Sequence, residues 1–168
     1  MSSLYTAIGL TQPALSETIP NYGPACLIAN FVLSYLVLAP RHLKQYHGID
    51  HNVSPREDLT KYGEAAVRAG KITQKQLNMM RRNEAAQANA VENFTLLVAG
   101  VAMASYAGVP RTTINAAGLT YTLARFSYGV FYVFIERQEW SLLRSAAWWV
   151  GNLSCLHLLW QAGRLLSS

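Results

Sequence analysis

The positive charges of this chain are confined so narrowly that long stretches on either side carry almost none. Nine of its fourteen Lys and Arg residues fall between residues 41 and 82. A helix needs roughly 20 apolar residues to cross the hydrocarbon core of a bilayer, and four nearly uncharged stretches approach that length. The pattern predicts an all-α integral membrane protein, a four-transmembrane-helix bundle in which the polar faces of the spans point inward.

The four expected spans are residues 24–40, 84–107, 113–135 and 142–161, in a single domain over residues 1–168. Because cytoplasmic loops are enriched in Lys and Arg, the basic interval is expected to form a cytoplasmic helical loop over residues 41–82. The first 24 residues lack the Lys and Arg of a cleavable signal peptide, so the first span is expected to remain as an anchor. We expect an endoplasmic reticulum or other intracellular membrane, with the active-site side facing the cytoplasm.

Two helix-start signatures predict that the basic interval is folded. Residues 54–57 and residues 73–76 each match a capping box, in which a hydroxyl and a Glu or Gln bond the helix start. Gly70 is expected to end the first helix, over residues 55–69. The second helix meets no breaker before Gly108, so it should continue into the membrane as one rod of about 34 residues.

Further signals predict where the later helices begin and end. Gly108 and Pro110 predict a tight turn after the long rod, because Gly ends helices and Pro prevents their continuation. Thr112 or Thr113 is then expected to cap the third span, and Ser141 the fourth.

Cysteine and histidine usage predicts no metal site. Cys26 and Cys155 lie in expected spans without zinc or CxxC spacing, so both are expected to be buried, reduced thiols. The three histidines between residues 42 and 51 are expected to be solvated at the interface, and His157 to be a satisfied core residue. The basic interval is interleaved with acids beside the spans, which favours anionic lipids or a small anionic ligand over nucleic acid.

The residues that suggest chemistry lie at the start of the second span. Arg82, Asn89, Glu92 and Asn93 recur at helical spacing, which predicts that they lie along one stripe. A carboxylate at membrane depth requires a partner from another helix, and Arg125 of the third span is a candidate. Either these two residues form an ion pair, or the guanidinium binds the carboxylate of a ligand.

Three tyrosines flank Arg125 at helical spacing, and Arg144 begins the fourth span at the same expected end of the bundle. Cationic groups from three spans should therefore converge on the cytoplasmic half, which favours an acidic ligand. Tyr128 and Tyr132 would add phenolic donors, whereas Tyr121 is better explained as a packed aromatic residue. Arg144 also has a simpler explanation, since Arg is common beside lipid headgroups.

These residues resemble those of a known family, the membrane-associated proteins in eicosanoid and glutathione metabolism, which includes microsomal glutathione transferases. The segment RNEAAQANAVENF looks like the second-helix motif of that family, while ARFSYGVFY and RSAAWWVG are similar to its third- and fourth-helix motifs. The resemblance implies a homotrimer with glutathione bound as cosubstrate between neighbouring subunits. The residues that it implies are Arg82, Asn89, Glu92, Asn93, Arg125 and Tyr128 for glutathione binding, and Arg144, Ser145 and Tyr132 for catalysis.

The resemblance implies a membrane-bound, glutathione-dependent transferase or peroxidase whose lipophilic electrophile arrives from the bilayer. Ala85 stands where several family members have a second Arg, which keeps open an isomerase or cyclase of specialised metabolite biosynthesis on the same scaffold. A non-catalytic lipid-binding scaffold protein is a third interpretation. The stretch between Tyr132 and Arg144 is a few residues longer than in typical bacterial relatives, which affects the register of Arg137 and Arg144.

Overall fold

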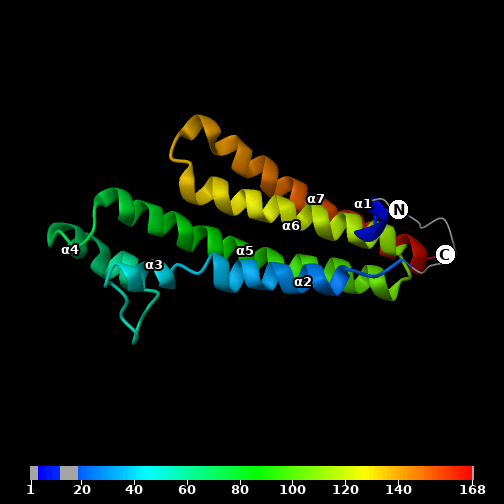
Figure 1. Ribbon diagram of the computed structural model, residues 1–168, viewed down its shortest axis with the longest axis horizontal. Coiled ribbons are helices and arrows are strands. Elements are labelled where there is room, and N and C mark those ends of the chain that lie inside the picture. The colour runs from blue at the N-terminus through cyan, green and yellow to red at the C-terminus, as the bar shows by residue number, and fades with distance from the viewer. Residues whose placement is uncertain (1–3, 12–18, 168) are drawn as a thin grey trace.

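The computed structural model describes residues 4–11 and 19–167, and long helices dominate them. The four longest helical stretches are α2 (Gly23–Val32) with its π-helical continuation (Leu33–Val37), α5 (Gln74–Tyr106), α6 (Arg111–Phe134) and α7 (Ser141–Leu166). The shorter elements are α1 (Leu4–Ala7), α3 (Arg41–Tyr46), a π-helical turn (Asp58–Tyr62) leading into α4 (Gly63–Arg68), and a 3-10 turn (Gln138–Trp140). The helices α5, α6 and α7 pack against one another, and α2 packs against α5 and α6 (Figure 1).

One helical stretch of the described residues is both long and apolar enough to cross a membrane by itself. It is Gly23–Tyr46, with 24 residues and a mean hydropathy of 1.6. The helices α5, α6 and α7 contain 33, 24 and 26 residues. They are long enough to cross a membrane, but their polar side chains lower their hydropathy. A spanning role for these three helices is a proposal.

Small residues let the long helices approach closely. A Cβ atom on Gly100 of α5 would lie 3.3 Å from the carbonyl oxygen of Cys155 on α7, and one on Gly118 of α6 would lie 2.8 Å from Sγ of Cys26. Both cysteines are free thiols, Cys155 fully buried and Cys26 half-buried. His157 is exposed on α7, so its prediction as a core residue is wrong; Cys155 and Leu158 fill the core beside it.

The long second rod is confirmed as a helix. Thr73 caps α5 with a complete capping box, in which its Oγ1 accepts a hydrogen bond from the Gln76 amide at 3.2 Å and the Gln76 side chain accepts one from the Thr73 amide at 2.7 Å. The helix then continues without interruption for 33 residues. Gly108 follows its end at a φ of +76°, which a residue without Cβ adopts easily.

Three expected caps are wrong. The helix expected from residue 55 begins at Asp58 without a side-chain cap, because residues 54–57 form a turn closed by the Glu57 amide on the Ser54 carbonyl. The third long helix begins at Arg111, since Pro110 itself occupies the cap position ahead of the two threonines. The fourth begins at Ser141 directly after a 3-10 turn, which leaves Trp140 at its cap.

The basic interval folds into a compact unit on the first turns of α5. It includes α3 and α4 and lies at the end of the molecule opposite α1 and the C-terminal end of α7 (Figure 1). The unit has an apolar core of its own. That core consists of Ile49, Leu59, Ala66, Ile72, Leu77 and Met80.

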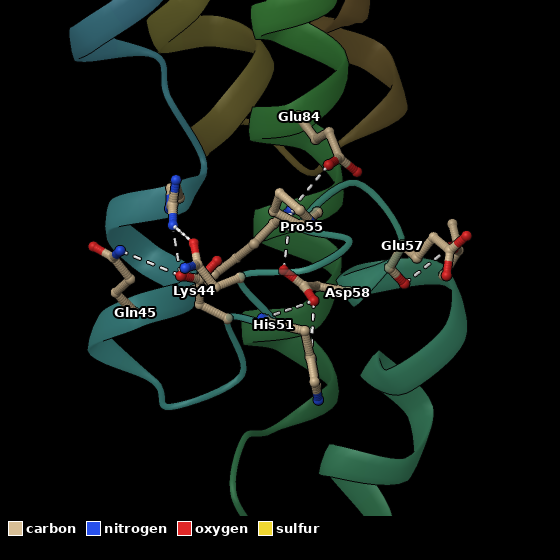
Figure 2. A network of polar contacts seen from close by, with 11 residues as sticks. Lys44, Gln45, His51, Pro55, Glu57, Asp58 and Glu84 are labelled. Carbon is tan, nitrogen blue, oxygen red and sulfur yellow. Dashed lines mark hydrogen bonds and ion pairs between the residues drawn. The ribbon is translucent and has the colours of Figure 1, made fainter.

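A buried cation anchors this unit to α5 (Figure 2). Lys44 is 3 % exposed, and its Nζ donates to the Pro55 carbonyl at 2.6 Å and to the Glu84 carboxylate at 3.1 Å. The fully buried Asp58 carboxylate lies 3.8 Å from the same Nζ. It also accepts a hydrogen bond from the amide of His51, whose ring is exposed as expected yet lies 2.9 Å from the carboxylate. Asp58 therefore faces inward, into the contact between the basic unit and α5.

Candidate functional site

The most deeply buried charge among the long helices belongs to Arg125 of α6. Its side chain is 2 % exposed. Nη1 donates to Oδ1 of Asn89 on α5 at 3.0 Å, and Nη2 donates to Oδ1 of Asn152 on α7 at 3.1 Å. Nε is buried and has no hydrogen-bond partner among the described residues. A cation is thus held between three helices by two neutral amides, an arrangement that we call the Arg125 clamp.

Of the two interpretations of Glu92 and Arg125, the ion pair is wrong within one protomer, because Arg125 bonds Asn89 and Asn152 instead. Glu92 is exposed on a single protomer, and within residues 4–11 and 19–167 its carboxylate forms no salt bridge. Three residues turn a helix by about 300°, which leaves Glu92 about 60° away from Asn89 around α5. The prediction of a single polar stripe missed this offset.

Aromatic rings connect the clamp to Arg144. The Arg125 guanidinium lies 5.2 Å from the ring centre of Tyr121 and 5.5 Å from that of Tyr128. The rings of Tyr128 and Tyr132 are 5.4 Å apart, and the Arg144 guanidinium lies 4.4 Å from the Tyr132 ring centre. Each cation is within cation–π range of a ring. Tyr128 and Tyr132, which we call the tyrosine ladder, therefore connect the two guanidinium groups.

The remaining predicted residues take different places. Asn93 donates from its side chain to the Asn89 carbonyl at 2.9 Å, and its own carbonyl accepts from the Tyr121 hydroxyl at 2.9 Å. Tyr121 is 1 % exposed, which agrees with its interpretation as a packed aromatic residue. Ser145 is exposed on α7, and no hydrogen bond joins it to the ladder in the described part of the chain.

Arg82 lies at the open end of the site. Its Nε donates to the Val133 carbonyl at 3.1 Å, and its Nη2 pairs with the Glu136 carboxylate at 3.0 Å. A cavity of about 410 Å³ is lined by Arg82 together with Arg137 and Arg144. Two of the predicted cations therefore face the same cavity, at the end of α6 and the start of α7.

Sequence reasoning missed Asn152, which supplies the second amide of the clamp. The residue is 5 % exposed on α7, and in the sequence it stands out only as the start of an Asn-Leu-Ser triplet. A polar residue in the middle of an expected span was a usable signal, because such residues face the interior of a bundle. Its partner could not be named without the relative rotation of α6 and α7.

Long packed helices that hold a buried guanidinium on two side-chain amides define an all-α protein with a cationic site, which suits an anionic ligand. A family model described as the MAPEG family matches residues 22–164, which is most of the chain, and the chain belongs to that family. Membership confirms the resemblance seen in the helix motifs and shows a membrane protein of a family concerned with glutathione and eicosanoid chemistry. No curated protein and no solved structure matches the chain.

Proposed function

We propose that this protein is a membrane-bound, glutathione-dependent transferase or peroxidase acting on a lipophilic electrophile. The observation that carries the proposal is the charge of Arg125, buried among helices and held by amides rather than by acids. A charge in a medium of low dielectric constant acts more strongly than one in water. Its field therefore favours an anion in the cavity that Arg144 lines, to which Tyr128 and Tyr132 connect it.

The residues around the cavity fit glutathione, which carries two carboxylates and one ammonium group. Arg82 and Arg144 are positioned to contact a carboxylate or thiolate, since both line the cavity. Arg125 is too buried to be the first contact and acts through its field. Asn89 orients Arg125, while Glu92, Asn93 and Tyr128 remain proposed members of the same site, with Glu92 contributing from the exposed face of α5.

The proposed chemistry depends on the charge state of a thiol. Glutathione supplies that thiol, whose unperturbed pKa is about 8.5. A guanidinium such as Arg144 beside the sulfur lowers the thiol pKa and raises the fraction of nucleophilic thiolate at neutral pH. Tyr132 packs against Arg144 at 4.4 Å and can orient it. The contacts favour Tyr132 over the exposed Ser145 as the neighbouring hydroxyl donor.

An exposed face of α5 supports the homotrimer. Its residues recur at alternating intervals of three and four, the spacing of helices that pack along a shared seam. All but one are small, as is usual at helix contacts in membranes. They are Ala85, Ala88, Glu92, Thr95, Ala99 and Ala102. A threefold contact through this face would cover Glu92 and bring each cavity close to a neighbouring subunit.

Family membership and the four long helices support four spans with the compact basic unit on the cytoplasmic side of an intracellular membrane. The cavity at Arg82 lies at the same end as that unit, because α5 starts there (Figure 1). Glutathione would then enter from the cytosol, and the electrophile laterally from the bilayer.

A second function is favoured by one residue. Ala85, exposed on α5, stands where several family members have an Arg, and its methyl group offers no charged contact to glutathione. An isomerase or cyclase that uses this cavity without glutathione accommodates that change.

Calorimetry on the purified protein in detergent tests these functions, with thiolate absorbance and conjugation rates as further readouts. We expect glutathione binding, a thiolate signal, and a loss of about a hundredfold in kcat/KM for Arg144→Ala. Arg164→Ala, an exposed residue near the other end of α7, is the matched control and should behave as wild type. Absence of binding would exclude the transferase and favour the isomerase. Binding with no thiolate and no effect of Arg144→Ala would point to a lipid-binding scaffold.

A further inference from the structure

A cavity of about 760 Å³ extends beyond the candidate site. It lies between the first turns of α5 and the connection from α6 to α7. It shares Arg82 and Arg137 with the smaller cavity that Arg144 lines, but Lys75 belongs to it alone. The proposed glutathione residues do not account for this space.

The charges around the larger cavity are unbalanced. Lys75, Arg82 and Arg137 face Glu136 as the single acid, which leaves an excess of two positive charges. Glu136 is already paired with Arg82 at 3.0 Å. The side chains of Lys75 and Arg137 have no ion-pair partner in the part of the chain that the structure describes. Both are therefore available to an added anion.

The rest of the wall is apolar and opens outward. Met79, Phe134 and Trp140 line it, and Phe134 and Trp140 are 69 % and 52 % exposed. Phe134 is the last residue of α6, so on the proposed membrane placement this wall lies at the depth of the lipid headgroups. Tryptophan is enriched at that depth, and basic pockets on the cytoplasmic side bind anionic headgroups.

We propose that this cavity binds the phosphate of an anionic glycerophospholipid from the surrounding leaflet, with Lys75 and Arg137 on the phosphate and Phe134 against the first part of an acyl chain. The inference rests on the membrane placement given under the proposed function but not on glutathione chemistry. Arg137 lines both cavities, whereas Lys75 does not line the cavity proposed for glutathione. Lipid binding and glutathione binding can therefore fail separately.

The test compares two charge-matched single variants. Lys75→Gln removes the free cation that lines this cavity but not the glutathione cavity, whereas Arg68→Gln removes an exposed cation that lines neither. Each protein is placed in phosphatidylcholine nanodiscs with and without a minor fraction of phosphatidylglycerol. Native mass spectrometry counts retained lipid, and calorimetry measures glutathione binding in parallel. A third arm adds soluble glycerol phosphate to phosphatidylcholine nanodiscs.

We expect wild type and Arg68→Gln to retain phosphatidylglycerol in preference to phosphatidylcholine. Lys75→Gln should lose about fivefold in that preference, the effect of one basic residue near an anionic surface. Glutathione affinity should stay within about threefold in both variants, because neither side chain lines the glutathione cavity. Equal retention by both variants would overturn the proposal, as would a wild type without lipid preference. Retention of glycerol phosphate but not of phosphatidylglycerol would overturn the lipid as the ligand.

Discussion

Two buried cations in this molecule have polar partners of opposite kinds. Lys44, in the compact basic unit, has the Asp58 and Glu84 carboxylates within 4 Å (Figure 2). Arg125, in the packed long helices, has the side-chain amides of Asn89 and Asn152 and no acid partner among the described residues. Both side chains are almost fully buried, at 3 % and 2 % exposed.

The difference separates a structural charge from an available one. A buried cation and the carboxylate beside it form a pair whose field is weak at longer range. Such a pair acts mainly on the stability of the fold. A buried charge satisfied by amides is solvated by their dipoles and keeps its net charge, which a nearby anion can then neutralise. The comparison therefore assigns Lys44 to stability and Arg125 to ligand binding.

The largest expected effect is on the stability of the basic unit. Lys44→Met leaves Asp58 buried without its cationic partner, and loss of one partner of a buried pair costs about 3–5 kcal/mol. Thermal unfolding in detergent should show that loss, with glutathione affinity unchanged at temperatures where the variant is folded. Lys71→Met, on an exposed side chain of the same unit, should leave stability close to wild type. A stability loss under 1 kcal/mol for Lys44→Met would contradict the assignment of Lys44 to stability.

Arg125→Met is expected to lower glutathione affinity more clearly than it lowers stability. The two amides lose a hydrogen bond each but leave no uncompensated charge, so we expect a stability loss of about 2 kcal/mol. Glutathione affinity should fall by about tenfold or more, because the buried charge is gone. Calorimetry measures the affinity, and Arg164→Met is the control at the other end of the long helices. Unchanged glutathione affinity in a folded Arg125→Met protein would contradict the assignment of Arg125 to binding.

The smallest expected effect is at the open end of the site. Glu136 pairs with Arg82 and competes with a ligand carboxylate for it. Glu136 is about half exposed, and such pairs contribute up to about 1 kcal/mol. Glu136→Gln should therefore raise glutathione affinity two- to fivefold in a titration at low salt. Glu139→Gln, on the same connection but outside both cavities, should not raise it; if it does, the gain reflects general charge rather than release of Arg82.

The helices and the family could be predicted from the sequence because their signals are local. The capping box at Thr73 and the absence of breakers up to Gly108 specify α5 almost to the residue. The motifs around Asn89, Arg125 and Arg144 are sufficiently specific to indicate the family that the family model confirms. Each of these signals lies within one helix.

The partners of the buried charges could not be predicted because they depend on how separate helices are rotated. Asn152 accepts a hydrogen bond from Arg125, whereas the ion-pair interpretation gave that place to Glu92. The rotation of α5 and α7 about their axes decides which of the two side chains points inward. Lys44 looked like one of many basic residues beside a membrane. Its side chain is held by Pro55 and Glu84, which lie 11 and 40 positions away in the sequence.

Asn152→Asp tests the central assignment most directly, because it gives Arg125 the acid partner that Lys44 already has without changing the size of the side chain. We expect a folded protein of at least wild-type stability whose glutathione affinity, measured by calorimetry, is lower by about tenfold or more. Asn78→Asp, an exposed change of the same kind on α5, should change affinity little. A folded Asn152→Asp protein that binds glutathione as tightly as wild type would contradict the account.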